Sequence, residues 1–212
     1  MQAALLSTAY LPPIQYMSKF LSRDVSIECH ENYPKQTYRN RCNILSANGP
    51  IALTIPTIKQ HGQKTRITEV RIDYDLPWQK IHFKSIESAY KNSPFYDYYI
   101  DELAFYYTKQ FEFLFDYNLE IIKTLLDISE IPFTAQYTSH YEKNIVGEDF
   151  RYSITPKESQ QSKDSSFVAT EYYQVFEDKY RFVPNLSYID LLFNEGPNAK
   201  EILACCIKKG ED

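Results

Sequence analysis

The sequence has little of several things that mark particular classes of protein. Only five of its 212 residues are glycine, and they form neither a G-x-G-x-x-G nor a G-x-x-x-x-G-K-[ST] run, which argues against a glycine-rich phosphate loop. The four cysteines have no C-x-x-C spacing and no secretory leader precedes them, so we expect free thiols and a cytoplasmic protein. No apolar run approaches the roughly 20 residues of a membrane span. We expect no metal site, because no metal-ligand spacing occurs, and the sequence identifies no cofactor.

Basic residues are fewer than acidic ones, with 23 Lys and Arg against 28 Asp and Glu. The net charge is −5 and the pI is about 5.5, which predicts no nucleic-acid partner. A local group of cations in such an acidic chain points instead to a small anionic ligand. Apolar residues make up 43% of the chain, enough for the core of a single domain over residues 1–212. The 19 tyrosines give much of the aromatic surface a hydroxyl that can face a wet cleft.

The N-terminal stretch predicts a strand, a turn, a helix and a second strand. Residues 3–9 and 25–29 are short apolar runs typical of buried strands. Between them, Pro12-Pro13 can start a helix over residues 14–21, because the first N–H groups of a helix have no partner within it. We therefore predict an α/β fold with a Rossmann-like βαβ unit at its N-terminal end, a mixed sheet, a helical middle and C-terminal helices.

The rest of the chain gives the remaining elements. We expect a hairpin of 41–45 and 51–55 about Asn48-Gly49 and a half-buried strand at 67–72. Helices are expected at 79–90, from a cap at Ser93 to about residue 128, from Ser187 to Gly196, and at 199–208. Extended segments are expected at 131–141 and 170–176, and loops at 60–65 and 155–166. The domain thus divides into a sheet-rich part (1–75), a helical part (76–130) and a part that completes the sheet and adds helices (131–212).

A polar block between two apolar runs is the main candidate for a binding site. It contains the cations Lys35, Arg39 and Arg41, and arginine suits bidentate binding of phosphates and carboxylates. If the block is extended, the three cations share a face. The alternative is surface ion pairing with Glu28 and Glu31. The residues predicted to bind the ligand are Tyr10, Gln36, Tyr38, Arg39, Asn40, Arg41 and Trp78.

The placement of this block follows from the βαβ unit. Ligands of such units bind beyond the carboxyl ends of the strands, which here are Tyr10-Leu11-Pro12 and Glu28-Cys29-His30. We therefore expect Tyr10 and the cations to line one cleft.

Two histidines and a lysine are candidates for catalysis. His82 is expected in the first turn of a helix, neutral at pH 7 and directed toward the cations, where it can act as a general acid or base. His30 can play the same part, and Lys35 is the third candidate. The alternatives are a core-edge role for His82 and a surface or turn position for His30.

Four ordered blocks of sequence resemble the WbqC-like protein family. The blocks are 8–16 (TAYLPPIQY), 33–41 (YPKQTYRNR), Trp78 with 82–95 (HFKSIESAYKNSPF), and 182–197 (FVPNLSYIDLLFNEGP). Members often occur with genes for surface-polysaccharide assembly. The resemblance therefore implies a transferase that passes an amino-acyl (glycine) or acyl group to a sugar from a phosphate-bearing donor, such as a nucleotide sugar or an acyl or amino-acyl donor. A non-catalytic binding or assembly protein of the same pathway is the alternative.

Overall fold

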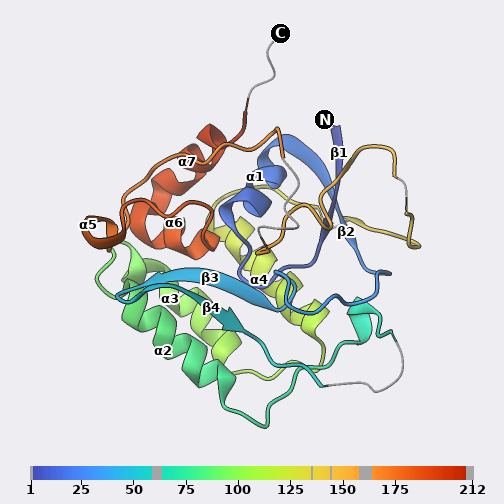
Figure 1. Ribbon diagram of the computed structural model, residues 1–212, viewed down its shortest axis with the longest axis horizontal. Helices are drawn as coiled ribbons and strands as arrows, with labels where there is room; N and C mark the ends of the chain where they lie inside the picture. Colours follow the sequence, from blue (N-terminus) through green and yellow to red (C-terminus); the bar gives the residue numbers. More distant parts are fainter. Residues whose placement is uncertain (1, 59–63, 135, 144, 158–163, 209–212) are drawn as a thin grey trace.

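The fold begins with the βαβ unit that the sequence predicts. The structure is a computed structural model that describes residues 2–58, 64–134, 136–143, 145–157 and 164–208 (Figure 1). Its helices are α1 (Ile14–Ser22), α2 (Trp78–Tyr90), α3 (Tyr96–Ala104), α4 (Leu114–Ile128), α5 (Glu177–Tyr180), α6 (Tyr188–Glu195) and α7 (Ala199–Cys205), and its strands are β1 (Gln2–Ser7), β2 (Arg23–Glu28), β3 (Arg41–Ser46), β4 (Gly49–Thr54), β5 (Gln136–Tyr137) and β6 (Glu148–Asp149).

Four parallel strands form the main sheet, in the order β5-β2-β1-β6. β1 and β2 pair over their full six residues, from Gln2 with Arg23 to Ser7 with Glu28. The outer strands add only two residues each. Alternate residues of β1 and β2, such as Leu6 and Ile27, belong to the hydrophobic core, and α1 packs against both strands. The sheet therefore has one face toward the core.

A close approach of backbone brings β6 to β1. Gly147 has a φ of +122°, and a Cβ atom on it would lie 2.7 Å from the carbonyl oxygen of Ala3. Only glycine fits this conformation and this contact without strain. The chain can therefore turn directly into the two-residue strand that completes the sheet.

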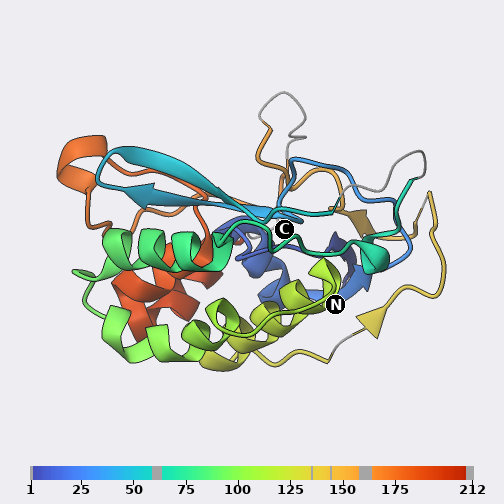
Figure 2. The same ribbon diagram turned by 90° about the horizontal axis from the view of Figure 1, so that it is seen from below.

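The β3–β4 hairpin forms a separate two-stranded sheet, turned at Ala47 and Asn48. It lies across the molecule over α2, and β3 packs against that helix (Figures 1 and 2). Lys179 and Tyr180 of α5 donate hydrogen bonds of 2.8 and 3.1 Å to the carbonyl of Ala47 at the hairpin turn. The hairpin is thus attached to both the middle and the C-terminal part of the chain.

The C-terminal helices complete the core. Every residue of α6 from Tyr188 to Asn194 is buried, and α6 contacts α1, α3 and α7. Ser187 fixes the start of α6, because its hydroxyl donates to the carbonyl of Leu11 at 2.9 Å. The hydroxyl therefore bonds the backbone just before Pro12-Pro13 and makes no side-chain hydrogen bond to its own helix.

Two expectations for the middle of the chain were wrong. The long helix from Ser93 is divided into α3, a 3₁₀ turn at Phe105–Tyr107 and α4, and Ser93 caps no helix, since Phe95 is the residue before α3. The amide of Gln79 donates to the carbonyls of Tyr106 (2.9 Å) and Lys109 (2.7 Å). These bonds satisfy carbonyls of the break, so the chain can leave the helix there.

The expected strands at 67–72 and 170–176 were also wrong. Ile67–Glu69 is a 3₁₀ turn, with isolated bridges at Arg71 and Ile72. Residues 170–176 form no strand, because carboxylate side chains take backbone N–H groups of this segment: Tyr173 N–H donates to Glu195 at 3.0 Å and Gln174 N–H to Glu177 at 3.3 Å. Of the expected loops, residues 60–63 and 158–163 lie outside the described residues.

Candidate functional site

The carboxyl ends of four parallel strands meet at one edge of the sheet. Here β1 ends at Ser7, β2 at Glu28, β5 at Tyr137 and β6 at Asp149. This is the edge at which open α/β sheets bind ligands. The residues that follow the strands therefore define the candidate site.

A group of charged side chains lies at this edge; four of them are buried, and the side chain of Asp149 is 34% exposed. We call it the ion cluster; its members are Glu28, Glu31, Arg39, Asp149 and Arg151. Glu28, Glu31, Arg39 and Arg151 are each at most 2% exposed. Arg39 donates from Nε (2.7 Å) and an Nη atom (2.5 Å) to the two carboxylate oxygens of Glu31, a bidentate pair. Burial raises the pKa of Glu31, and Arg39 acts in the opposite direction.

Arg151 joins the two halves of the ion cluster. It donates to Glu28 (2.8 Å) and to Asp149 (3.0 and 2.7 Å), while its own carbonyl accepts from Arg39 at 3.0 Å. A charge this deeply buried is stable only with such partners. The two arginines therefore act inside the protein as counterions to its own carboxylates.

The ion cluster holds both ends of residues 138–142, which we call the anchored loop. At its start, the Thr138 hydroxyl donates to Glu28 at 2.9 Å, and the Thr138 carbonyl accepts from Nε2 of His30 at 3.0 Å. At its end, the carbonyl of Glu142 accepts from Arg151 at 2.8 Å. The ring of Tyr141 lies against the Arg151 guanidinium, 4.8 Å from ring centre to Cζ. The short loop between these contacts is thereby fixed in place.

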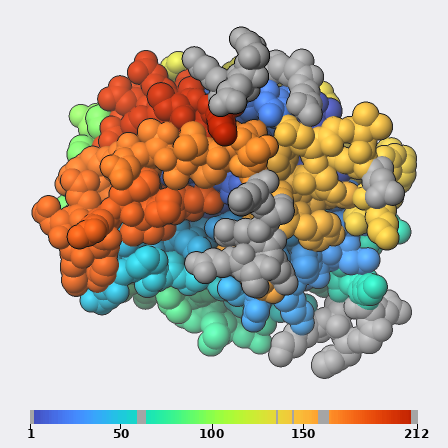
Figure 3. Space-filling model, turned by 45° about the horizontal axis from the view of Figure 1, so that its top comes forward, coloured from blue at the N-terminus to red at the C-terminus, as the bar shows by residue number. Residues whose placement is uncertain are grey.

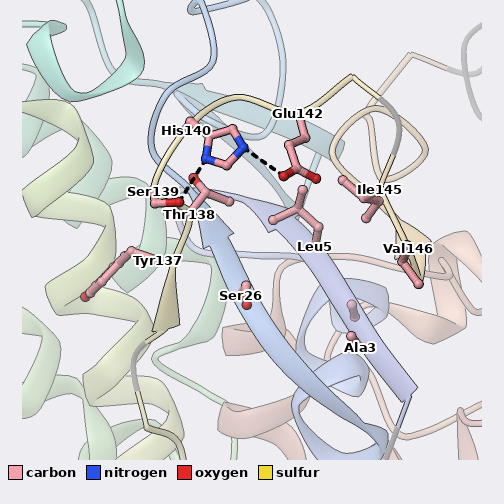
Figure 4. A pocket seen from close by; sticks show the side chains of 11 residues that line it. Ala3, Leu5, Ser26, Tyr137, Thr138, Ser139, His140, Glu142, Ile145 and Val146 are labelled. Carbon is pink, nitrogen blue, oxygen red and sulfur yellow. Dashed lines mark hydrogen bonds and ion pairs between the residues drawn. The ribbon is translucent and has the colours of Figure 1, made fainter.

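The anchored loop covers a hollow on the sheet face that is turned away from the core. Its volume is about 280 Å³, close to the lower limit of small-ligand pockets. Ala3, Leu5 and Ser26 form its floor, and Ile145 and Val146 close one side (Figure 4). The yellow segments with residues 140–143 and 145–150 lie at the molecular surface (Figure 3). A small molecule can therefore reach the hollow from solvent.

Three side chains above this hollow are joined by hydrogen bonds. The Ser139 hydroxyl lies 2.9 Å from Nδ1 of His140, and Nε2 of His140 lies 2.8 Å from a carboxylate oxygen of Glu142. Figure 4 shows them above the ends of the two central strands, with both interactions drawn. We call them the Ser-His-Glu row. A hydroxyl, an imidazole and a carboxylate in this sequence can activate the hydroxyl.

The predicted cationic block is divided between the interior and the surface. It is a loop followed by a turn, with a positive φ of 61° at Gln36, so its cations do not share a face as an extended segment would. Lys35 and Gln36 are exposed, Arg41 is half-buried at the start of β3, and Arg39 is buried against Glu31. The alternative to a ligand site was ion pairing of these cations with Glu28 and Glu31 at the surface. Arg39 does pair with Glu31, but the pair is buried.

Other residues predicted to bind the ligand lie inside. Tyr10 is fully buried and its N–H donates to the carbonyl of Tyr38 at 2.8 Å. Asn40 is 7% exposed and donates to the carbonyl of Ile55 at 3.0 Å. Trp78 is buried and packs against His82. A ligand-binding role for these residues stays a prediction.

His82 lies in the first half of α2 and is also buried. Its Nδ1 faces the Tyr10 hydroxyl at 2.9 Å, and that hydroxyl lies 3.0 Å from the hydroxyl of Tyr107. Burial lowers the pKa of His82 to about 4, and a hydrogen bond to the backbone of Thr54 acts in the opposite direction. The ring is therefore neutral at pH 7, through burial more than through the helix terminus. Its contacts are those of a core residue, and a catalytic role stays a prediction.

His30 is the predicted catalytic residue that the structure brings to the sheet edge. It is half-buried, its backbone N–H donates to Glu28 at 2.7 Å, and its ring bonds the anchored loop through Thr138. Lys35 lies apart, on the exposed loop of the cationic block. His30 thus lies beside the Ser-His-Glu row.

The sequence analysis missed the residues that line the hollow. Residues 131–141 were expected only to be extended, and the row at Ser139, His140 and Glu142 was not singled out. The sequence does contain a pattern that could have indicated the row: a hydroxyl, an imidazole and a carboxylate lie within four residues directly after an extended segment. What the sequence could not show is that Arg151, nine residues beyond Glu142, fixes that segment.

Fold and site together define an α/β protein with a small hollow on the outer face of a parallel sheet, bordered by residues that follow the carboxyl end of β5. Residues 8–157 match the model of the WbqC-like protein family, and the chain belongs to that family. The resemblance drawn from the sequence is thereby confirmed over this range, while the block at 182–197 lies outside it. No curated protein and no solved structure matches the chain significantly.

Two features of other protein classes are absent from the part of the chain that the structure describes. No helix in the described ranges has the length and apolar composition needed to cross a membrane. Over the same residues, no group of three or more His, Cys, Asp or Glu side chains is placed to hold a metal ion.

Proposed function

We propose that this protein is a cytoplasmic transferase of surface-polysaccharide (O-antigen-like) assembly that passes an acyl or amino-acyl group from a phosphate-bearing donor to a sugar. The observation that supports it is the hollow on the outer face of the sheet: residues 139–142, which follow the carboxyl end of β5, place hydroxyl, imidazole and carboxylate groups around a space of about 280 Å³. That volume suits a group as small as a glycyl or acetyl unit.

The carboxyl edge of the sheet supplies a proton acceptor. Because Nε2–H of His30 donates to the Thr138 carbonyl, its Nδ1 carries the lone pair that can take a proton from an attacking amine or hydroxyl. The donor's phosphates are proposed to lie toward exposed cations such as Lys35. Membership of the WbqC-like family supports the pathway.

The test is a thermal-shift screen of the full chain, followed by mass spectrometry of the products. The ligands are nucleotide sugars, acyl and amino-acyl donors, free nucleotides and simple polyanions. Stabilisation by a donor, together with a modified sugar in the product mixture, is the expected result. Stabilisation by a nucleotide sugar with no transfer from any donor overturns the transferase and favours a non-catalytic binding protein. Equal stabilisation by every polyanion overturns a specific donor site.

A further inference from the structure

The Ser-His-Glu row is a continuous path of hydrogen bonds from a hydroxyl to a carboxylate. Since Nε2 of His140 is 2.8 Å from Glu142, the proton that the pair shares belongs on Nε2. Nδ1 then holds the lone pair and accepts from the Ser139 hydroxyl at 2.9 Å. This is the arrangement of nucleophile, base and orienting acid that activates a serine.

Buried residues of the ion cluster hold the Ser-His-Glu row in place. The anchored loop that carries it is bonded to Glu28 at Thr138 and to Arg151 at Glu142, and both of these partners are buried. Supports of this kind fix the geometry of reacting side chains better than a free loop does. The three side chains are themselves exposed above the hollow, so a substrate can meet them.

We propose that Ser139 is a nucleophile that accepts a small acyl group from an activated ester or thioester, with His140 as its general base and Glu142 as a positioning residue. The hollow takes the acyl group: Leu5, Ile145 and Val146 offer it apolar contact, and its carbonyl lies toward the row (Figure 4).

The reaction has two balanced steps. Ser139 Oγ bonds to the carbonyl carbon while its proton passes to Nδ1 of His140; the bond from that carbon to the leaving oxygen or sulfur breaks, and the leaving group takes the proton. In the second step an acceptor hydroxyl or water gives its proton to His140 and bonds to the same carbon. Ser139 Oγ then leaves and regains the proton.

The two ring nitrogens are used in the opposite order from that of serine proteases, in which Nε2 faces the serine. The reason is local: Ser139 and His140 are neighbours in the chain, and the hydroxyl of one reaches only the nearer ring nitrogen of the other. The chemistry needs one nitrogen as acceptor and the other as donor, and both orders meet that need.

The test uses a fluorophosphonate, whose phosphorus is attacked by an activated serine with loss of fluoride. We expect a single adduct, located at Ser139 by peptide mass spectrometry, and a burst of p-nitrophenol from p-nitrophenyl acetate. Ser139→Ala should give no adduct, and His140→Ala should label about 100-fold or more slowly. Ser88→Ala, at an exposed position of α2, is the matched control and should label as the wild type does.

Glu142→Gln separates a positioning role from a structural one. It should slow labelling, because the ring is no longer held in the orientation and tautomer that leave Nδ1 free for Ser139, and Glu142→Asp, which keeps the carboxylate, should restore part of the rate. An unchanged melting temperature shows that each variant is folded. Labelling at another residue, or an unchanged labelling rate in His140→Ala, would overturn the assignment of Ser139 as a nucleophile activated by His140.

Because this inference deepens the proposed function, its failure must be separable from that of the transferase. Transfer to a sugar at the wild-type rate by Ser139→Ala overturns the covalent step alone. Labelling of Ser139 with no transfer from any donor to any sugar overturns the proposed transferase alone.

Discussion

Arg39 and Arg151 show how burial determines the work of a single charged residue. In the sequence Arg39 resembles a cation of a ligand site, yet both arginines are at most 2% exposed and face a buried carboxylate. A guanidinium removed from water in this way stabilises the protein only as long as its partner remains. The contribution of the ion cluster is therefore best tested by measuring the free energy of unfolding of variants that lack one of its members.

Arg151→Met should destabilise the protein by ~3–5 kcal/mol, because Glu28 would be left as a buried charge without its counterion. Arg71→Met is the matched control: Arg71 pairs with Glu112 at 2.6 Å, but both side chains are more than half exposed, so the loss should be ~0–1 kcal/mol. Urea unfolding at pH 7 measures both. Equal losses in the two variants would show that the ion cluster adds no more than a surface pair.

His82 makes the stability depend on pH. Its pKa is about 4 in the folded protein and ordinary in the unfolded chain, near 6.5. As the pH falls, the unfolded chain takes up the proton first, so the stability present above pH 6.5 is lost progressively toward pH 4.

The comparison is with His82→Gln, which keeps a hydrogen-bonding side chain but does not titrate. The unfolding free energy of the wild type minus that of the variant should fall by on the order of 3 kcal/mol between pH 7 and pH 4. A difference that stays constant over this range would mean that His82 is not buried as a neutral ring.

Among the elements, agreement between the sequence and the structure follows the length of the local pattern. β1, α1 and β2 each have at least six residues, enough for an apolar run or a helical pattern to show, and the hairpin has a turn signal at Asn48-Gly49. Both the βαβ unit and the hairpin could therefore be predicted. β5 and β6 have two residues each, too few for any period. Only their partners in the sheet make them strands.

The candidate site was predictable only in part, for the same reason. The carboxyl ends of β1 and β2 gave its position, and His30 lies there as predicted. The row at 139–142 depends on contacts with residues as distant as Glu28, and no pattern within the loop records these. The break before α4 likewise depends on the distant Gln79.

Asp190 of α6 links three segments of the chain: α6 itself, α2 and the segment that contains Tyr172. Its carboxylate accepts from the hydroxyls of Tyr90 (2.8 Å) and Tyr172 (2.7 Å), and burial raises its pKa to about 6. Tyr172→Phe should cost ~1.5–3 kcal/mol, the value of a hydrogen bond to a charged group. Tyr173→Phe, at the exposed neighbouring position, should stay within about 0.5 kcal/mol. Thermal unfolding of both variants at pH 7 measures the difference, and equal melting temperatures would contradict the link.

At the scale of the whole molecule, the core does not end where the family match ends. The match closes at residue 157, but α6 is buried along its length and packs against α1 and α3. Without it, the apolar faces of these helices would meet water. The N-terminal parallel sheet and the C-terminal helices therefore share one core.

Accordingly, a fragment of residues 1–157 should not fold cooperatively. It should lose its near-UV circular dichroism and bind the dye ANS, as loosely packed states do, while a fragment ending at residue 208 should melt in one sharp transition. A sharp melt of the shorter fragment would show that the C-terminal helices are an addition to a complete core.

The strand order has a consequence for the chain while it is being made. β1 and β2 are complete once residue 28 has been synthesised, yet their outer neighbours begin at residues 136 and 148. At roughly 5–20 residues per second, both open edges of this strand pair wait on the order of ten seconds for their partners. During that time the nascent chain carries unpaired backbone next to apolar side chains, the condition in which strands join those of other chains. Ribosome-bound chaperones would therefore be expected to matter most for this protein between the synthesis of β2 and that of β6.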